Sequence, residues 1–347
     1  MNKFAFLLHP LGMQDVYNYA PESRHRNPEL VKAIMKKWVP PFPVKRFRIT
    51  SLTGREIEGV VISVPLLPEQ FFDSDQRQCL EKILAAGRMA EEMDTKLLGL
   101  GALTAVIGRN GKFVADKLSI GVTTGNSYTV AISVQQLLAA AQKMSIPRET
   151  ARLTIIGATG SIGRACARLL APCVAHLTLV ARQILPLKLL GKDIAETWGR
   201  SVALESDARK SVQNADLVLL ATSAPGMIID VGDLKPGAVV ANVAKPDNID
   251  LTQRFKRPDV LMFDAGFVGC PKKRVVEVFN RNFPYVAGID SQEIFGCFAE
   301  TIVLAFEEQF SDYSLGRDLD PLKIKAIAEA GVKHGFFIPE LAPQLMS

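Results

Sequence analysis

The sequence predicts an α/β protein in which a doubly wound parallel sheet is joined to a second, mixed α/β domain that C-terminal helices complete. Three observations lead to this fold class. Residues 151–289 alternate short apolar runs with helical segments, a rhythm typical of parallel sheets covered by helices. Residues 1–120 mix apolar runs with one long helical pattern, and the chain is helical again after Asp290. With 347 residues, 48% of them hydrophobic, the chain is long enough for two cores.

The first predicted domain spans residues 1–128. Apolar runs predict strands over residues 4–8, 44–49 and 58–64, and apolar residues at helical spacing predict a helix over residues 74–93. A further helix is predicted over residues 128–144. The break at Ile146-Pro147 ends it, so we expect this helix to join the two domains.

The second predicted domain spans residues 129–289. It contains five strand-like runs, ARLTIIG, LTLVAR, ADLVLLATS, AVVANVA and VLMFDAG, with helices predicted over residues 161–170 and 188–198. Because strands and helices alternate, we expect a parallel sheet with helices on both faces. Residues 290–347 form the third predicted part. Helical patterns over residues 289–308 and 321–334 are expected to pack back on the first domain.

A glycine-rich loop opens the second domain. The run LTIIGATGSIG leads from a predicted strand into a predicted helix. Gly157 permits a tight turn, Gly160 lets the backbone approach a pyrophosphate, and Gly163 lets helix and strand pack closely. The predicted dinucleotide-binding loop consists of Gly157, Ala158, Thr159, Gly160, Ser161, Ile162 and Gly163. Its place between strand and helix predicts a Rossmann-type domain.

The end of the next strand indicates which dinucleotide binds. Arg182 stands where NAD enzymes usually have an acidic residue for the ribose hydroxyls. An arginine can pair with a 2′-phosphate, so the sequence predicts NADPH. Thr222, Ser223 and Val243 follow later strands and are further cofactor-binding candidates, although turn capping explains the two hydroxyls almost equally well.

The polar run TTGNSYT, residues 123–129, lies at the predicted domain boundary. Thr124, Asn126 and Ser127 carry small hydroxyl and amide groups that suit hydrogen bonding to a carbonyl or an oxyanion. The same residue types also suit a helix N-cap, and both interpretations stay open.

Cys297 lies in the apolar run FGCFAETIVLAF. On composition alone it is a packing residue, because a free cysteine among Phe, Ile, Val and Leu usually is. Gly296 removes bulk beside the thiol, and the polar residues 290–293 place it near a helix terminus. A helix N-terminus lowers a thiol's pKa and favours the nucleophilic thiolate.

The composition excludes several other functions. The 41 basic and 36 acidic residues give a net charge of +5 without a dense basic patch, so no nucleic-acid partner is expected. We find no signal peptide, and no apolar run approaches the ~18 residues of a membrane span. Five cysteines without a CxxC pair and four histidines without metal-ligand spacing predict a cytoplasmic protein with no bound metal.

Motifs along the whole chain resemble one family. FAFLLHPLG opens the sequence and is followed by TSLTG, TTGN, GATG, CFAE and VKHGF, in that order. Together they resemble the long-chain fatty acyl-[acyl-carrier-protein] reductases, known best from cyanobacteria, which supply fatty aldehyde for alkane synthesis. The resemblance implies NADPH-dependent reduction of a long-chain acyl-[acyl-carrier-protein] to a fatty aldehyde.

The resemblance also assigns a nucleophile. In that family the cysteine before Phe-Ala-Glu takes the acyl group from the carrier thioester, and Cys297 occupies this position. It implies an acyl-Cys297 intermediate that a hydride from NADPH converts to the aldehyde. Residues 1–128 and the C-terminal helices are then expected to enclose the acyl chain, and contact with the periphery of a membrane is compatible with such a substrate.

An acidic acyl carrier protein is the implied donor, with acyl coenzyme A as an open alternative, and an aldehyde-consuming enzyme is a further implied partner. Three basic clusters are candidates for receiving the carrier: Lys36-Lys37, Lys45-Arg46 and residues 272–274. Each of them is also explained as a solvated face of the protein.

Two rival functions stay open. The first is an NADP oxidoreductase like the shikimate or amino-acid dehydrogenases, acting on a small polar substrate, with Cys297 as a packing residue. The second is a non-catalytic NADP-binding partner of another lipid enzyme. Tyr128 stands where the family pattern has a histidine, and the run VAKP at 243–246 also departs from it. These departures leave the acyl-chain length and the donor undetermined.

Overall fold

The computed structural model describes residues 1–72, 76–224, 226–279 and 291–340. Backbone contacts divide the described residues into two compact units, Met1–Tyr128 with Val268–Phe337, and Thr129–Phe267 with residues 338–340. The second predicted domain extended to residue 289, whereas the second unit ends at Phe267. The difference arises because strand β13 (Lys273–Val278) forms an antiparallel ladder with β2 (Phe42–Thr50) of the first unit.

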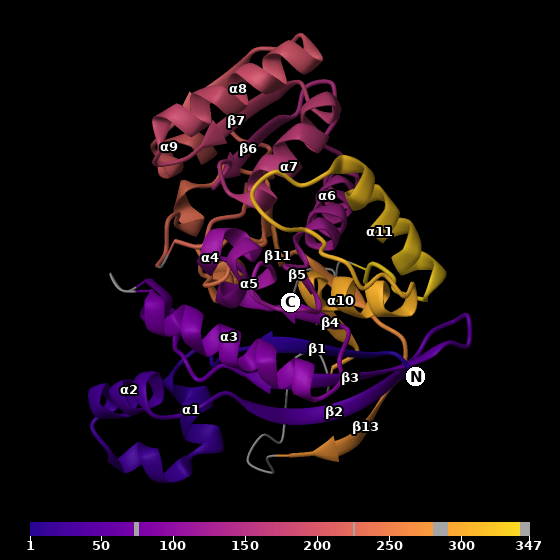
Figure 1. Cartoon of the computed structure of the whole chain (residues 1–347). Helices are drawn as coiled ribbons and strands as arrows, with labels where there is room; N and C mark the ends of the chain where they lie inside the picture. Colours follow the sequence, from indigo (N-terminus) through magenta and orange to yellow (C-terminus); the bar gives the residue numbers. More distant parts are fainter. Residues whose placement is uncertain (73–75, 225, 280–290, 341–347) are drawn as a thin grey trace. The chain divides into compact units, whose positions relative to one another are not determined.

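The first unit is built on a six-stranded mixed sheet in the order β13-β2-β3-β1-β4-β5 (Figure 1). The strands not yet named are β1 (Lys3–Leu8), β3 (Glu56–Ser63), β4 (Leu97–Leu100) and β5 (Gly121–Thr123). Strands β3, β1, β4 and β5 run parallel to one another, and β2 pairs with β3 in the antiparallel sense. The three strands predicted here from apolar runs correspond to β1, β2 and β3.

Two helices pack on this sheet, α3 (Arg77–Glu92) and α10 (Gly296–Phe306). Along β1, Phe4 and Phe6 contact the ring of Phe298 in α10, whereas Ala5 and Leu7 belong to the core cluster that includes α3. Successive side chains of a strand point to opposite faces, so the two helices cover opposite faces of the sheet. Gly99 of β4 allows the close approach of α10, because a Cβ there would lie 2.2 Å from Thr301 Oγ1.

The remaining elements of this unit are short helices and a two-stranded sheet. The helices are α1 (Met13–Tyr19), α2 (Pro28–Lys37), α4 (Ile107–Asn110), α5 (Lys112–Ala115) and α11 (Pro321–Lys333). Strand β12 (Phe267–Gly269) pairs with β14 (Glu293–Phe295). Helix α6 (Asn126–Lys143) begins in this unit and continues into the second, at the position predicted for a connecting helix.

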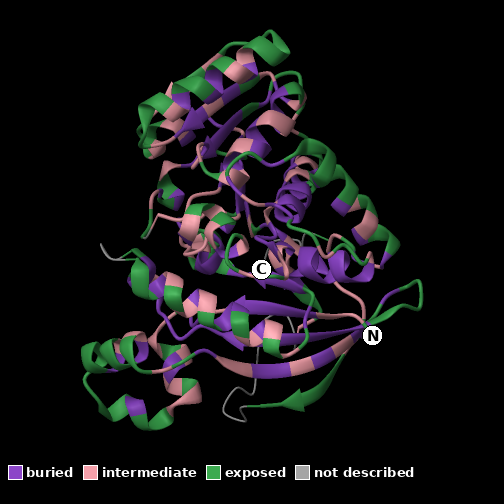
Figure 2. Cartoon of the chain, viewed as in Figure 1, coloured by how far each residue is buried: buried purple, intermediate pink, exposed green. Residues whose placement is uncertain are grey.

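The prediction that residues 289–308 form one amphipathic helix is wrong in two respects. Residues 289 and 290 lie outside the described residues, and the chain at Glu293–Phe295 forms β14, so the helix begins only at Gly296. Helix α10 is also not amphipathic: it is buried almost all round, as Figure 2 shows in purple. A helix that is apolar on every side is typical of a core position, which local spacing did not distinguish.

The second unit contains a six-stranded parallel sheet in the order β11-β10-β9-β6-β7-β8. The strands are β6 (Arg152–Ile156), β7 (His176–Val180), β8 (Val202–Glu205), β9 (Leu217–Leu220), β10 (Val239–Asn242) and β11 (Leu261–Asp264). Numbered within the unit, the order is 3-2-1-4-5-6, that of the Rossmann fold. The predicted fold class is confirmed, although β8 was not predicted.

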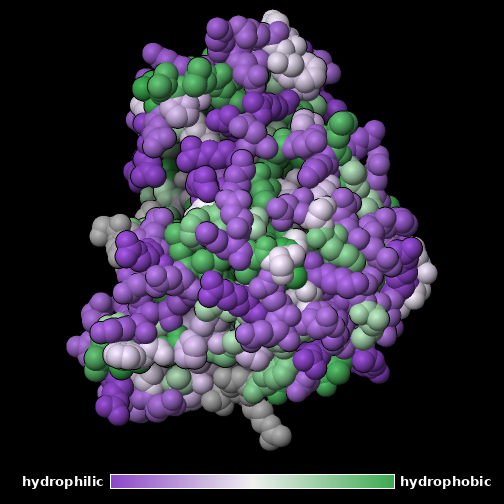
Figure 3. Space-filling view, in the orientation of Figure 1, coloured by the Kyte–Doolittle hydropathy of each residue, from purple (hydrophilic) through white to green (hydrophobic). Residues whose placement is uncertain are grey.

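Helices α7 (Ser161–Leu170), α8 (Ile184–Trp198) and α9 (Ala208–Val212) connect the first four of these strands. Hydrophilic residues cover most of the face in Figure 3, with a hydrophobic group over α8 near the top, where Ile184, Leu185 and Leu189 are exposed. Within the described part of the chain, every helix is too short or too polar to cross a membrane.

Candidate functional site

Cys297 is the second residue of α10, in the first turn of the helix. Of the eleven residues of α10, all described by the structure, Cys297 alone is not buried. The prediction that this thiol lies near a helix N-terminus is therefore confirmed. The first turn of a helix has N–H groups without helical partners, and those of Cys297 and Phe298 act to lower the pKa of the Cys297 thiol.

The TTGN run lies directly against Cys297. Gly125 has φ +73°, and a Cβ on it would lie 2.1 Å from the Cys297 Cα and 2.3 Å from its Cβ. Only glycine satisfies both the left-handed backbone and this contact. The two motifs, 172 positions apart in the sequence, therefore meet main chain to main chain.

A buried carboxylate holds the two motifs together. Glu300, one helical turn after Cys297, accepts hydrogen bonds from the Thr123 hydroxyl and, at 2.8 Å, from the Tyr128 N–H. Its side chain is fully buried, which raises the pKa of the carboxyl, while the hydrogen bonds from Thr123 and from the backbone of Tyr128 and Gly125 oppose that shift. The carboxylate thus stands at the N-terminus of α6, where an anion is favoured.

Two of the three predicted oxyanion candidates form hydrogen bonds with Ser314 instead. Thr124 donates its hydroxyl proton to the Ser314 carbonyl at 2.5 Å, and the Ser127 hydroxyl accepts from Ser314 Oγ at 2.7 Å. Both side chains are buried, so they tie the start of α6 to the segment around Ser314. Asn126, the first residue of α6, is partly exposed and lies next to Gly125. It is therefore the candidate best placed to reach a ligand.

The environment of Cys297 does not favour the thiolate. Burial raises the pKa of the thiol to about 11, and the Glu300 carboxylate adds to this, whereas N–H groups of Ala102, Phe298 and Cys297 oppose it. The prediction that the helix N-terminus lowers this pKa is wrong, because desolvation outweighs the helix dipole here.

The SLTG and VKHGF motifs lie at the opposite end of α10. Arg55 donates to the Phe306 carbonyl at 2.6 Å, which satisfies the last turn of the helix with a cation. The ring of His334 stacks on Phe306 with centroids 4.7 Å apart, and its Nε2 lies 2.5 Å from a Glu307 carboxylate oxygen. Burial lowers the pKa of His334. Both motifs therefore fix the helix that carries Cys297 and lie away from its thiol.

Tyr128, which departs from the family pattern, is a packing residue. Its side chain is buried, and its ring meets that of Phe336 edge-on with centroids 6.3 Å apart. The hydroxyl fills the space left by Gly331, where a Cβ would lie 2.0 Å away. The tyrosine links the start of α6 to the VKHGF segment.

In the second unit, the glycine loop has the predicted form. Gly157 has φ +84°, and a Cβ on Gly163 would lie 2.3 Å from the Gly157 carbonyl oxygen. The loop connects β6 to α7, and the N-cap residue Gly160 makes no side-chain capping bond. The glycine turn therefore leads directly into the N-terminus of α7, where free N–H groups favour an anion.

The other predicted cofactor residues lie around this loop. Arg182 is exposed two residues after β7, and the Gly157 N–H donates to the last carbonyl of that strand at 2.9 Å. The Gly157 backbone also abuts Ala221 and Thr222 at the end of β9. The Thr222 hydroxyl accepts from the Ala224 N–H at 3.1 Å, which is the capping role that was left open. The Val243 N–H, directly after β10, donates to the carbonyl of Leu220 in β9 at 2.8 Å, so Val243 lies at the carboxyl edge of the sheet. Ser223 directly follows Thr222 in the chain.

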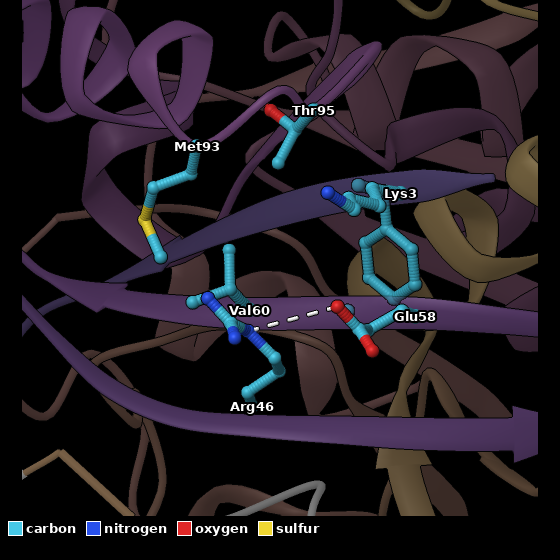
Figure 4. Close-up of a pocket in the computed structure, with 8 residues that line it drawn as sticks. Lys3, Arg46, Glu58, Val60, Met93 and Thr95 are labelled. Atoms are coloured by element: carbon cyan, nitrogen blue, oxygen red, sulfur yellow. Dashed lines mark ion pairs between the residues drawn. The ribbon is translucent and has the colours of Figure 1, made fainter. Parts of the chain in front are cut away.

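Two of the three basic clusters are brought together by the ladder of β2 and β13, in which Arg274 stands opposite Arg48 and Glu277 opposite Arg46. Lys45 is buried and does not contribute to the surface. Figure 4 shows a hollow on the same sheet, with the Arg46 Nε and a Glu58 carboxylate oxygen 3.6 Å apart. Its volume of about 10 Å³ is close to the space that one water requires, so an acyl chain does not fit there.

Sequence reasoning missed the roles of two residues. The Ala102 N–H acts to lower the pKa of Cys297, and the adjoining Leu103 N–H donates to His9. Both contacts join positions far apart in the chain. The signal for His9 was present in the FAFLLHPLG motif, but Ala102 has no side-chain chemistry that a sequence pattern could reveal.

Two curated relatives illustrate what the chain is similar to, and no protein-family model matches it. The chain is similar to aminotransferase PigE of Serratia sp., with 31% identity over 348 residues that cover 98% of this chain and 40% of that protein. It is also similar to the long-chain acyl-[acyl-carrier-protein] reductase of Synechococcus elongatus, with 28% identity over 312 residues that cover 86% of this chain and 87% of that enzyme. The chain thus spans less than half of the Serratia protein's length.

Among solved structures, the chain is similar to ligand-free 5-ketofructose reductase of a Gluconobacter species. The identity is 15% and the TM-score 0.39, with 95% of this chain and 98% of that chain covered. It is also similar to Δ1-pyrroline-2-carboxylate reductase of Thermococcus litoralis, with 15% identity and a TM-score of 0.28, covering 34% of this chain and 36% of that one.

The contact between Gly125 and Cys297 can be tested by comparing two glycines. Gly54 has a similar φ of +79° but nothing near its Cβ position, so Gly54→Ala is expected to cost only the left-handed backbone strain, ~1–2 kcal/mol. Gly125→Ala adds a main-chain clash, and we expect a total loss of about 3 kcal/mol or more. Urea unfolding of both variants measures the difference, and equal losses would contradict the contact.

Glu300→Gln is expected to have two opposite effects. The amide keeps one acceptor oxygen where the carboxylate had two, so a buried donor loses its partner and the free energy of unfolding falls by about 1–3 kcal/mol. Removing the negative charge lowers the pKa of Cys297, so alkylation of that thiol at pH 8 should become faster. Glu307→Gln, the same change at the far end of α10, is the control. An unchanged or slower alkylation in Glu300→Gln would contradict the electrostatic coupling.

Proposed function

We propose that this protein reduces long-chain fatty acyl thioesters to fatty aldehydes with NADPH, through an acyl-enzyme thioester on Cys297. The observation that carries the proposal is that Cys297 alone is partly exposed on an otherwise buried helix, against the TTGN turn and with backbone N–H groups that oppose the rise in its pKa. The similarity to the Synechococcus reductase over 86% of the chain supports the choice of substrate.

In the first step the Cys297 sulfur attacks the carbonyl carbon of the donor thioester. The carbonyl π-electrons move to oxygen, and when the carbonyl re-forms, the carrier leaves as a thiolate that takes up a proton. Stabilisation of the oxyanion requires donors near the sulfur. The N–H groups of Ala102 and Phe298, which act to lower the thiol's pKa, would serve as such donors, and we propose that the partly exposed Asn126 side chain adds a third.

The glycine loop supplies the residues that would hold the dinucleotide. The N–H groups at the start of α7 would bind the pyrophosphate, and Arg182 would pair with the 2′-phosphate. Gly157 and Gly163 leave the space that a side chain would fill. When bound, NADPH supplies the hydride that reduces the acyl-Cys297 thioester to the level of the aldehyde.

We further propose that an acidic acyl carrier protein is the donor. Its docking surface would include the basic residues of β2 and β13, Arg46, Arg48, Lys273 and Arg274. Glu58 and Glu277 pair with part of this charge, so the surface is moderately basic. Such a surface favours fast, salt-dependent encounter more than tight binding.

A trapping experiment tests the covalent step. Incubation with a long-chain acyl-carrier thioester without NADPH should add one acyl group to Cys297, as measured by intact mass and peptide mapping. Because the thiol's pKa is about 11, the rate of acylation should rise about tenfold for each pH unit between about 7 and 9.

The matched controls are Cys297→Ala and Cys270→Ala. Cys270 is also a partly exposed free thiol, so its variant should still be acylated while Cys297→Ala should not. An adduct that persists in Cys297→Ala, or no adduct at all on the unaltered protein, would refute the covalent mechanism and return Cys297 to a packing role.

Cofactor choice is tested at Arg182. Loss of the charge-assisted hydrogen bonds to a 2′-phosphate should weaken NADPH binding by about tenfold or more in Arg182→Ala and leave NADH binding within about twofold. Fluorescence titration of both nucleotides measures this. Arg209→Ala, another exposed arginine of the same unit, is the control. Equal losses for the two nucleotides would mean that Arg182 does not contact the 2′-phosphate.

A further inference from the structure

His9 is a buried residue that the proposed chemistry does not use. It directly follows β1, and only 5% of its surface is exposed. Its ring packs against that of Phe71 with centroids 4.7 Å apart. Burial lowers the pKa of His9 to about 4, so the imidazole is neutral at physiological pH.

Both ring nitrogens of His9 have backbone partners, and together these define one tautomer. Nε2 lies 3.3 Å from the Leu103 backbone nitrogen, which can only donate. Nε2 must therefore be the acceptor, and Nδ1 carries the proton that it donates to the Pro10 carbonyl at 2.8 Å. The neutral histidine thus clamps two backbone segments.

Leu103, which His9 holds, belongs to a strained turn that follows β4. Ala102 has φ +49°, a left-handed conformation that costs a residue with a Cβ roughly 1–2 kcal/mol. Hydrogen bonds on either side hold it there: Gly101 N–H donates to Leu7, and Thr104 donates to Gly101 through its N–H and its hydroxyl. In this conformation the Ala102 N–H is one of the groups that oppose the rise in the pKa of the Cys297 thiol, so the turn faces that sulfur. Non-glycine residues in this region are often part of a functional site.

We infer that His9 is a positioning residue for the thiol: its Nε2 holds the Leu103 N–H and thereby keeps the adjoining Ala102 N–H aimed at Cys297. The role rests on the proposed function only in its purpose, since the His9–Leu103 hydrogen bond and the left-handed turn at Ala102 are properties of the fold. Through these contacts the residue that follows β1 acts on a sulfur 288 positions away in the sequence. The histidine of the FAFLLHPLG motif thus prepares the donor that stabilises negative charge on the sulfur and on the attacking acyl group.

Two substitutions separate the contacts of His9. The side chain of His9→Asn can still donate to Pro10 but is too short to reach Leu103, whereas that of His9→Gln can place an acceptor oxygen near the Nε2 position. The measurement is the rate of iodoacetamide alkylation of Cys297 between about pH 7 and 10, followed by peptide mass spectrometry. Cys173 and Cys270, which are also partly exposed, serve as internal references. His25→Asn, at an exposed histidine, is the matched control.

We expect His9→Asn to slow alkylation of Cys297 about tenfold, which corresponds to a rise of one unit in the thiol's pKa, and His9→Gln to restore most of the rate. The reference thiols and the His25→Asn protein should be unchanged. Rates within twofold of the unaltered protein in both folded His9 variants would overturn the inference. A loss that His9→Gln does not rescue would also overturn it, since that outcome indicates packing alone.

A second measurement needs no variant. Nitrogen NMR of the unaltered protein should show His9 protonated at Nδ1 and not at Nε2, and alkylation of Cys297 should shift the amide signal of Ala102. The Nε2-protonated tautomer would refute the clamp. If the tautomer and the alkylation rates are as expected but no acyl adduct forms, the proposed function fails and the positioning of the thiol by His9 stands.

Discussion

The buried carboxylate of Glu300 is the interaction on which the rest of the first unit depends. A carboxylate without solvent is costly unless donors surround it, and here the donors come from the turn that begins α6. The core helix α10 and the TTGN turn therefore stabilise one another: the turn supplies hydrogen-bond donors to the carboxylate, and the carboxylate accepts from the Thr123 hydroxyl and the Tyr128 N–H. The close contact between Gly125 and Cys297 follows from this pairing.

The same dry surroundings determine what the thiol can do. Cys297 is the one residue of α10 that is not fully buried, yet desolvation still raises the pKa of its thiol, and the first-turn N–H groups and Ala102 only partly compensate. Under the function proposed above, a substrate would bring a carbonyl oxygen to the same N–H groups. Catalysis by this site would then require that these donors stabilise the oxyanion more than the resting thiolate.

Sequence reasoning succeeded where the determinants are local. The glycine loop, the strand and helix alternation of the second unit and the position of Cys297 near a helix start all follow from residues within about two turns of one another. It failed where a partner lies far along the chain. The start of α10, the buried state of that helix and the raised pKa of Cys297 depend on Glu300, Gly125 and Ala102 meeting in space, and His9 acts over 94 positions on Leu103. A single sequence contains no record of such pairings.

These contacts also change what the family-like motifs mean. SLTG and VKHGF lie at the C-terminal end of α10, where Arg55 contacts the Phe306 carbonyl and His334 contacts Glu307. The histidine of HPLG accepts a hydrogen bond from the residue after Ala102. Only CFAE and TTGN reach the thiol directly. SLTG, VKHGF, CFAE and TTGN, which look like separate elements in the sequence, thus all contact α10 or the turn against it, whereas GATG belongs to the second unit. In the first unit these motifs serve to hold one buried helix and the backbone around one sulfur atom.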